Sequence, residues 1–192
     1  MLRIFWVLCL TLPTLIPSWA GHSTELGRPF YHPPSDSTKA VTTIVNFLNW
    51  YRTHYKEINE KGLSYADKNG WYKVDTLSCR EYLNKVMKSN FFTPNYKKLW
   101  QDYFVSKAGY WESNPQNEGP PEGFDYDLVL LTQEPELFYN KPESIAFKVI
   151  EQSQDFIVIG VTADWTLYFE MTQHKGKWII DYISSEGFDS LP

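Results

Sequence analysis

The fold is decided by the stretch SIAFKVIEQSQDFIVIGVTADWTLYFEMTQHKGKWIIDYIS, which covers residues 144–184. Its apolar residues recur largely at every second position, which is the period of a β-strand with one buried face. Short polar connections at residues 152–155, 162–164 and 172–176 divide it into four segments of strand length. The stretch therefore predicts four antiparallel strands joined by short turns.

The second of these segments differs from the others, because residues 156–161 are apolar on both alternating sides. An uninterrupted apolar run in an antiparallel sheet indicates a strand that is covered on both faces. Helices supply one cover. For the second we keep three alternatives: an N-terminal leader arm, the segment 111–133, or another copy of the protein in a homodimer that pairs through the sheet face.

Upstream of residue 144 the period changes from two to three and four, which is typical of helices with one buried face. These steps predict three helices, at residues 37–58, 76–90 and 94–108. Asp36 or Ser37 is placed to cap the first helix, and Thr93 followed by Pro94 opens the third. A block of helices followed by a block of strands predicts the α+β class, with N-terminal helices packed on a curved antiparallel sheet.

The connections between helices are predicted from their turn residues. Residues 59–75 read as a loop with a turn at Asn69-Gly70. Residues 111–125 contain three prolines and two glycines among polar residues, which favours an exposed loop. The apolar run at 126–133 fits a short strand or a buried turn, and the pattern does not choose between them.

The N-terminus has the pattern of a secretory signal peptide over residues 1–20. Arg3 precedes an apolar core, and Ser18-Trp19-Ala20 forms a small-x-small cleavage motif. The apolar stretch is too short for a relaxed membrane span, so we favour cleavage over a retained anchor. We therefore expect an exported protein, periplasmic or secreted, with an irregular leader at 21–36, a single domain at 37–186 and a tail at 187–192.

Charge and cysteine content narrow the range of partners. Without Arg3 the mature chain keeps 17 basic against 23 acidic residues, a net charge of about −6 without long runs of one sign. This disfavours a basic groove for nucleic acid. Only Cys79 remains after cleavage, so no internal disulfide is expected. We interpret Cys79 as a small buried apolar residue, with an exposed reactive thiol or an intermolecular bridge as the alternative.

Three short motifs carry a resemblance to a known family. They are the helix segment Phe47-Leu48-Asn49-Trp50-Tyr51, the segment Asp125-Tyr126-Asp127-Leu128-Val129 leading to Gln133-Glu134, and the closing strand Gly176-Lys177-Trp178-Ile179-Ile180-Asp181-Tyr182-Ile183. With them, the chain resembles the cone-shaped nuclear transport factor two-like, or cystatin-like, α+β superfamily, and within it a bacterial exported family of unknown function. Leu128 and Glu134 depart from the proline and aspartate of the family pattern. The resemblance implies a cavity between helix and sheet, and no activity that carries over.

The same superfamily includes ketosteroid-isomerase-like enzymes, which place carboxylates and tyrosines in that cavity for proton transfer. Asp127 and Tyr51 are the residues here that would serve as acid and base groups in such a site. The alternative, which we favour, is that the tyrosines fill the core and that Asp127 caps a loop.

Other motifs for chemistry are missing from the sequence. The four histidines do not have the spacing of a zinc site, and no serine lies in a Gly-x-Ser-x-Gly elbow. Prolines occupy the positions in Gly119–Gly123 where a phosphate loop needs backbone amides. We therefore predict no metal and no cofactor.

These observations favour a non-enzymatic binding module that recognises a protein partner or a small apolar ligand. An immunity-type protein that neutralises a toxin is one version. The alternative is a small cavity enzyme of isomerase or dehydratase type. Candidate binding residues are aromatic or polar and lie on the predicted helices, the 126–133 segment and the third strand: Tyr51, Tyr55, Trp100, Tyr103, Asp127, Gln133, Trp165 and Tyr168.

Overall fold

The computed structural model describes residues 35–185, and these belong to one compact unit. Three helices come first: α1 (Asp36–Ile58), α2 (Thr76–Met87) and α3 (Pro94–Ser113). Short elements separate them from the sheet: the hairpin of β1 (Ser64–Ala66) and β2 (Tyr72–Val74), then α4 (Glu136–Tyr139) and the 3-10 turn η1 (Pro142–Ser144). The predicted signal peptide, leader residues 21–34 and tail residues 187–192 lie outside the described residues.

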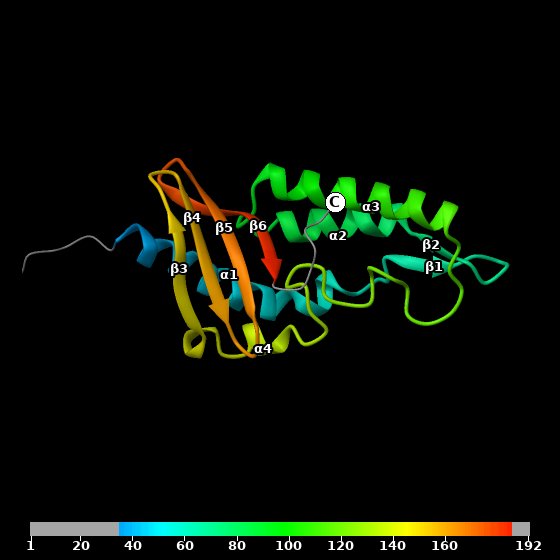
Figure 1. Cartoon of the computed structure of the whole chain (residues 1–192), viewed down its shortest axis with the longest axis horizontal. Helices are drawn as coiled ribbons and strands as arrows, with labels where there is room; N and C mark the ends of the chain where they lie inside the picture. Colours follow the sequence, from blue (N-terminus) through cyan, green and yellow to red (C-terminus); the bar gives the residue numbers. More distant parts are fainter. Residues whose placement is uncertain (1–34, 186–192) are drawn as a thin grey trace, which may run out of the picture. The chain divides into compact units, whose positions relative to one another are not determined.

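The C-terminal strands confirm the α+β prediction. They are β3 (Ala146–Gln152), β4 (Phe156–Thr162), β5 (Thr166–His174) and β6 (Lys177–Ser185). They pair antiparallel in the order of the chain (Figure 1). The turn between β5 and β6 is shorter than predicted, because Lys175 and Gly176 both adopt positive φ and close a two-residue turn.

The sheet is irregular at two places. The register shifts between Val149 and Glu151 in β3, and again opposite Glu170 and Met171, where β6 carries the extra residue. A bulge of this kind bends its strand and increases the local twist. Because the side chains alternate, Ile157, Ile159 and the matching residues of β5 and β6 form one buried inner face.

Helices cover that inner face. α1 contacts β4 and β6, and α3 meets β6 (Figure 1). Phe47 of α1 packs edge-on against Phe92 at 5.1 Å and lies 6.2 Å from Phe169 of β5. The predicted start of α1 is off by one or two residues: Ser35, not Asp36 or Ser37, caps the helix by accepting the Thr38 N–H at 3.3 Å.

α3 begins as predicted, with Thr93 as cap and Pro94 in the first turn, but it ends five residues later than expected. Trp111, predicted to lie in an exposed loop, belongs to its last turn and is buried. The Trp111 ring lies 5.3 Å from Phe124 and 6.1 Å from Tyr72. Burial of this large ring explains why the helix continues past Gly109.

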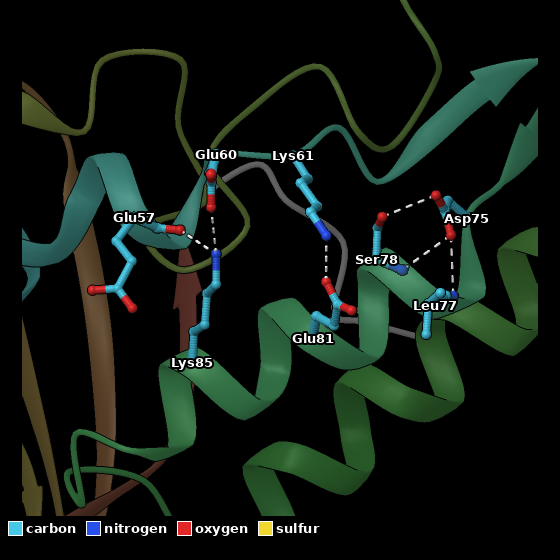
Figure 2. A network of polar contacts seen from close by, with 8 residues as sticks. All are labelled: Glu57, Glu60, Lys61, Asp75, Leu77, Ser78, Glu81 and Lys85. Atoms are coloured by element: carbon cyan, nitrogen blue, oxygen red, sulfur yellow. Dashed lines mark hydrogen bonds and ion pairs between the residues drawn. The ribbon is translucent and has the colours of Figure 1, made fainter.

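α2 is shorter than predicted and starts with a well-formed cap, shown in Figure 2. Asp75 Oδ1 accepts the backbone N–H groups of Leu77 at 3.1 Å and Ser78 at 3.0 Å. Asp75 Oδ2 accepts the Ser78 hydroxyl at 2.9 Å. Two backbone N–H groups and one hydroxyl at the start of the helix thereby have an acceptor. These hydrogen bonds lower the pKa of Asp75.

The outer side of α2 is linked to the end of α1 by surface contacts, also visible in Figure 2. Lys85 Nζ donates to the Glu57 carbonyl at 2.5 Å and pairs with Glu60 at 3.2 Å. Lys61 pairs with Glu81 at 2.7 Å. Exposed ion pairs of this kind contribute little stability, so they orient the two helices more than they hold them together.

The structure refines the predictions for two connecting segments. Residues 59–75 are not a plain loop, because β1 and β2 pair within them around a turn in which Gly70 has φ 85°. In the ambiguous 126–133 segment, the structure shows a buried turn. Asp127 and Thr132 form an isolated antiparallel bridge around it, and Leu128 to Leu131 are buried.

The outer face of the sheet is only partly covered within the described residues. Phe156, Val158 and Tyr168 alternate with the residues of the inner face and are half-buried on the other face. Pairing of two copies through this face stays a prediction. Among residues 35–185, no helix combines the length and apolar character needed to cross a bilayer.

Candidate functional site

Asp127 and Tyr51, the two residues named for the catalytic alternative, lie in direct contact. The Tyr51 hydroxyl donates to Asp127 Oδ2 at 2.5 Å, and both residues are buried. Asn59 approaches the Tyr51 oxygen from the other side at 3.4 Å. The sequence placed these residues in one predicted cavity, and the structure brings them together inside the core.

The other carboxylate oxygen of Asp127 organises the buried turn. Oδ1 accepts the backbone N–H of Val129 at 3.1 Å and of Leu130 at 2.7 Å. The Asp127 N–H donates to the Thr132 carbonyl at 2.8 Å, which closes the turn, and Leu131 takes positive φ at 51° to complete it. Asp127 thus caps a loop, as the structural reading of the sequence predicts.

Burial dominates the electrostatics of this pair. It raises the pKa of Asp127 from 3.8 to about 6, although the bonds from Tyr51, Leu130 and Val129 act in the opposite direction. Burial, followed by the charge of Asp127, raises the pKa of Tyr51 well above 10.0. Both groups therefore have perturbed protonation, but neither lines the pocket described next.

A pocket of about 720 Å³ opens beside this core. Its walls come from α3, the loop 122–126, residues 131–133, the turn before β5 and the end of β6. Aromatic and apolar side chains make up much of the lining, among them Tyr103, Tyr126, Leu131 and Trp165. A concave site that combines aromatic and apolar surface with several polar groups is typical of small-molecule binding.

Only three of the eight predicted binding residues line this pocket: Tyr103, Gln133 and Trp165. The Trp165 ring packs edge-on against Phe138 at 5.4 Å, which fixes its position at the pocket wall. The Tyr103 hydroxyl donates to the Gly123 carbonyl at 2.9 Å and ties α3 to the loop.

The other five predicted binding residues do not line this pocket. Trp100 is buried behind Tyr103, at 5.2 Å between rings. Tyr55 packs edge-on against Tyr51 at 5.7 Å. Tyr168 points to the outer face of the sheet, because it alternates with the buried Leu167 and Phe169 on β5.

The loop that closes the pocket contributes residues that sequence reasoning did not select. Lys107 of α3 reaches across to Glu122 at 3.3 Å, and its ammonium lies 5.1 Å from the centre of the Tyr110 ring. Gly123 has φ 85°, and a Cβ there would lie 2.3 Å from the Tyr103 hydroxyl oxygen. Only glycine fits this close approach, which brings the loop against α3.

Ser185, at the end of β6, is another pocket residue that was not predicted. It is 7% exposed, and its Oγ makes no hydrogen bond in the part of the chain that the structure describes. The run Glu122-Gly123-Phe124-Asp125-Tyr126 places two acidic and two aromatic residues within five positions, and this cluster was the available signal for the loop wall of the pocket. Ser185 gave no such signal.

Two further groups bear on chemistry. Cys79 is buried, as predicted, and its thiol contacts the Leu63 carbonyl at 3.6 Å. Burial raises the pKa of the Cys79 thiol to about 12, so the reactive thiolate does not form at neutral pH. Within residues 35–185, no cluster of three or more histidine, cysteine, aspartate or glutamate side chains is arranged to hold a metal ion.

In comparisons with known proteins, no family model, curated protein or solved structure matches this chain, and its resemblance to the nuclear transport factor two-like superfamily stays a prediction from sequence.

Proposed function

We propose that this protein is an exported, non-enzymatic binding module whose pocket at the end of the sheet receives a small, largely apolar ligand. The observation that carries the proposal is that the open pocket and the candidate acid–base pair lie at different places in the structure. The open pocket presents aromatic and apolar surface from Tyr103, Leu131 and Trp165, together with polar and charged side chains. The acid and tyrosine suited to proton transfer lie in the core and are hydrogen-bonded to each other. Export rests on the signal-peptide pattern of residues 1–20.

The unpartnered Ser185 hydroxyl also supports a ligand. Buried polar groups in proteins are almost always hydrogen-bonded, to the protein, to water or to a ligand. Ser185 lines the pocket, and its buried Oγ has no partner in the described chain. A polar group of a bound molecule would satisfy it, while the apolar part of that molecule covers Leu131 and Trp165.

The competing proposal is a cavity enzyme that uses Asp127. Its support is the carboxyl pKa of about 6, which suits a general acid or base near neutral pH. Against it, both carboxylate oxygens already accept hydrogen bonds from the protein. A substrate that used Oδ2 would have to replace its hydrogen bond from the Tyr51 hydroxyl.

A neutral fluorophore tests the binding proposal. We expect N-phenyl-1-naphthylamine to bind the purified protein saturably, with one molecule per chain, and to gain fluorescence as it leaves water. Trp165→Ala should weaken this binding by at least about fivefold, because an aromatic wall is lost.

The matched control is Trp71→Ala. Trp71 is also a partly exposed tryptophan, but it lies in the turn between β1 and β2 and outside the pocket lining. This variant should bind the fluorophore like the wild type. Absence of saturable binding, or equal weakening in both variants, would contradict the proposed function.

The alternative occupant is a protein, including a toxin neutralised by an immunity-type protein. Such a partner would contact the rim of the pocket as well as its interior. A protein partner captured from an envelope extract would compete with the fluorophore if it used the pocket, and would leave fluorophore binding unchanged if it used the outer face of the sheet.

A further inference from the structure

Negative charges outnumber positive charges among the residues that line the pocket. Among the described residues that line it, two carboxylates, those of Glu122 and Asp125, face one ammonium, that of Lys107. Lys107 is already engaged: it pairs with Glu122 at 3.3 Å, its side chain is 15% exposed, and it lies over the Tyr110 ring. Within residues 35–185, Asp125 makes no ion pair. The wall therefore carries a net negative charge.

The carboxylates also contribute to the raised pKa values of the two tyrosines in the pocket wall. Burial is the main cause of the raised pKa of Tyr126, with a smaller contribution from Asp125. The pKa of Tyr103 is raised by burial, then by Tyr126, and last by the two carboxylates. A negative potential beside aromatic rings favours a cation twice, through the carboxylate and through the electron-rich faces of the rings. The same potential disfavours an anionic ligand.

We propose that the ligand is an organic cation, an ammonium group attached to an apolar or aromatic body, whose charge is balanced by Asp125 and by the rings of Tyr103, Tyr126 and Trp165. This inference rests on the proposed function, since it names the class of ligand for the same pocket. Asp125 and the rings supply the specificity, and Leu131 with Trp165 accommodates the apolar body.

The test compares three probes that share an aromatic body and differ in charge. Benzyltrimethylammonium is the cation, neopentylbenzene is its uncharged isostere, and 3-phenylpropionate is an anion. Displacement of N-phenyl-1-naphthylamine from the purified protein measures each affinity. We expect the cation to bind at least about tenfold more tightly than the isostere, and the anion to bind most weakly. The preference should shrink as salt is added.

The variant Asp125→Asn isolates the carboxylate. It should weaken binding of benzyltrimethylammonium by about fivefold and leave binding of neopentylbenzene unchanged. The control is Asp155→Asn, which neutralises an exposed carboxylate at the opposite end of β4 from Trp165. This control should retain the cation preference.

The outcomes separate this inference from the proposed function. If the isostere or the anion binds as tightly as the cation, the pocket still binds apolar ligands but the cationic class is wrong. If Asp125→Asn and Asp155→Asn have the same effect, the role of Asp125 is wrong. If no probe of any charge and no fluorophore binds, the proposed function fails, and the inference fails with it.

Discussion

The Asp127 carboxylate lies in the core and accepts three hydrogen bonds. Its protonation is therefore coupled to the stability of the folded state. Its folded pKa of about 6 lies above the usual 3.8. The folded state therefore binds the proton more tightly than the unfolded state does. The stability from this group is fully present below about pH 4 and is lost as pH rises through about 6.

The first residue-scale prediction follows from that sign. The wild-type free energy of unfolding should be higher at pH 5.0 than at pH 7.5, by about 1.4 kcal/mol from this group. Asp127→Asn should remove most of this difference, because the amide does not titrate but can still accept from Val129 and Leu130 and donate to Tyr51. Urea unfolding at the two pH values measures both effects.

Two further variants, Asp127→Ala and Asp155→Asn, serve as comparisons. Asp127→Ala should cost about 3 kcal/mol at pH 7.5, since it leaves buried amides and the Tyr51 hydroxyl without their acceptor. Asp155→Asn should keep the wild-type pH dependence. An unchanged pH dependence in Asp127→Asn would contradict the role assigned to the buried carboxyl. Loss of ligand turnover in a stable Asp127→Asn protein would instead support the enzyme alternative.

At the scale of elements, Thr93 joins the start of α3 to β6. Its Oγ1 accepts the Tyr96 N–H at 3.2 Å and donates to Asp181 at 2.5 Å, while its backbone N–H donates to the Ile180 carbonyl at 3.0 Å. Thr93→Ala removes both side-chain bonds and should lower the free energy of unfolding by about 1 to 2 kcal/mol.

The control is Thr93→Ser, which keeps the hydroxyl and loses only a methyl group. Urea unfolding of the three proteins measures the cost. The serine variant should lie close to the wild type. If serine and alanine cost the same, the hydroxyl does not carry the connection between α3 and β6, and the loss comes from packing.

The elements also show what a sequence can predict. The four strands and the start of α3 were predictable, because alternation and the Thr93-Pro94 pair are local signals. The end of α3 was not, since Gly109 and the proline- and glycine-containing stretch at 115–123 suggest an earlier stop, whereas Trp111 packs against Phe124 and Tyr72 in the last turn. The β1–β2 hairpin was missed because its strands have three residues each.

At the scale of the whole described unit, the pocket brings together positions as distant in sequence as Tyr103 and Ser185. Such a site has no local signature, so only Tyr103, Gln133 and Trp165 were selected from the sequence. The pairing of Tyr51 with Asp127 was expected as part of a cavity, yet these residues lie in the core, because the Asp127 turn folds its carboxylate toward α1.

The central claim is that the pocket between α3, the 122–126 loop and the end of the sheet is the binding site. The most direct measurement is an NMR titration of the tryptophan indole N–H signals of the ¹⁵N-labelled protein with N-phenyl-1-naphthylamine, with the Trp165 signal assigned by Trp165→Phe. We predict that the Trp165 signal shifts saturably while that of Trp178, which lines a different pocket of about 390 Å³, does not. A shift of Trp178 with Trp165 unmoved would contradict the account.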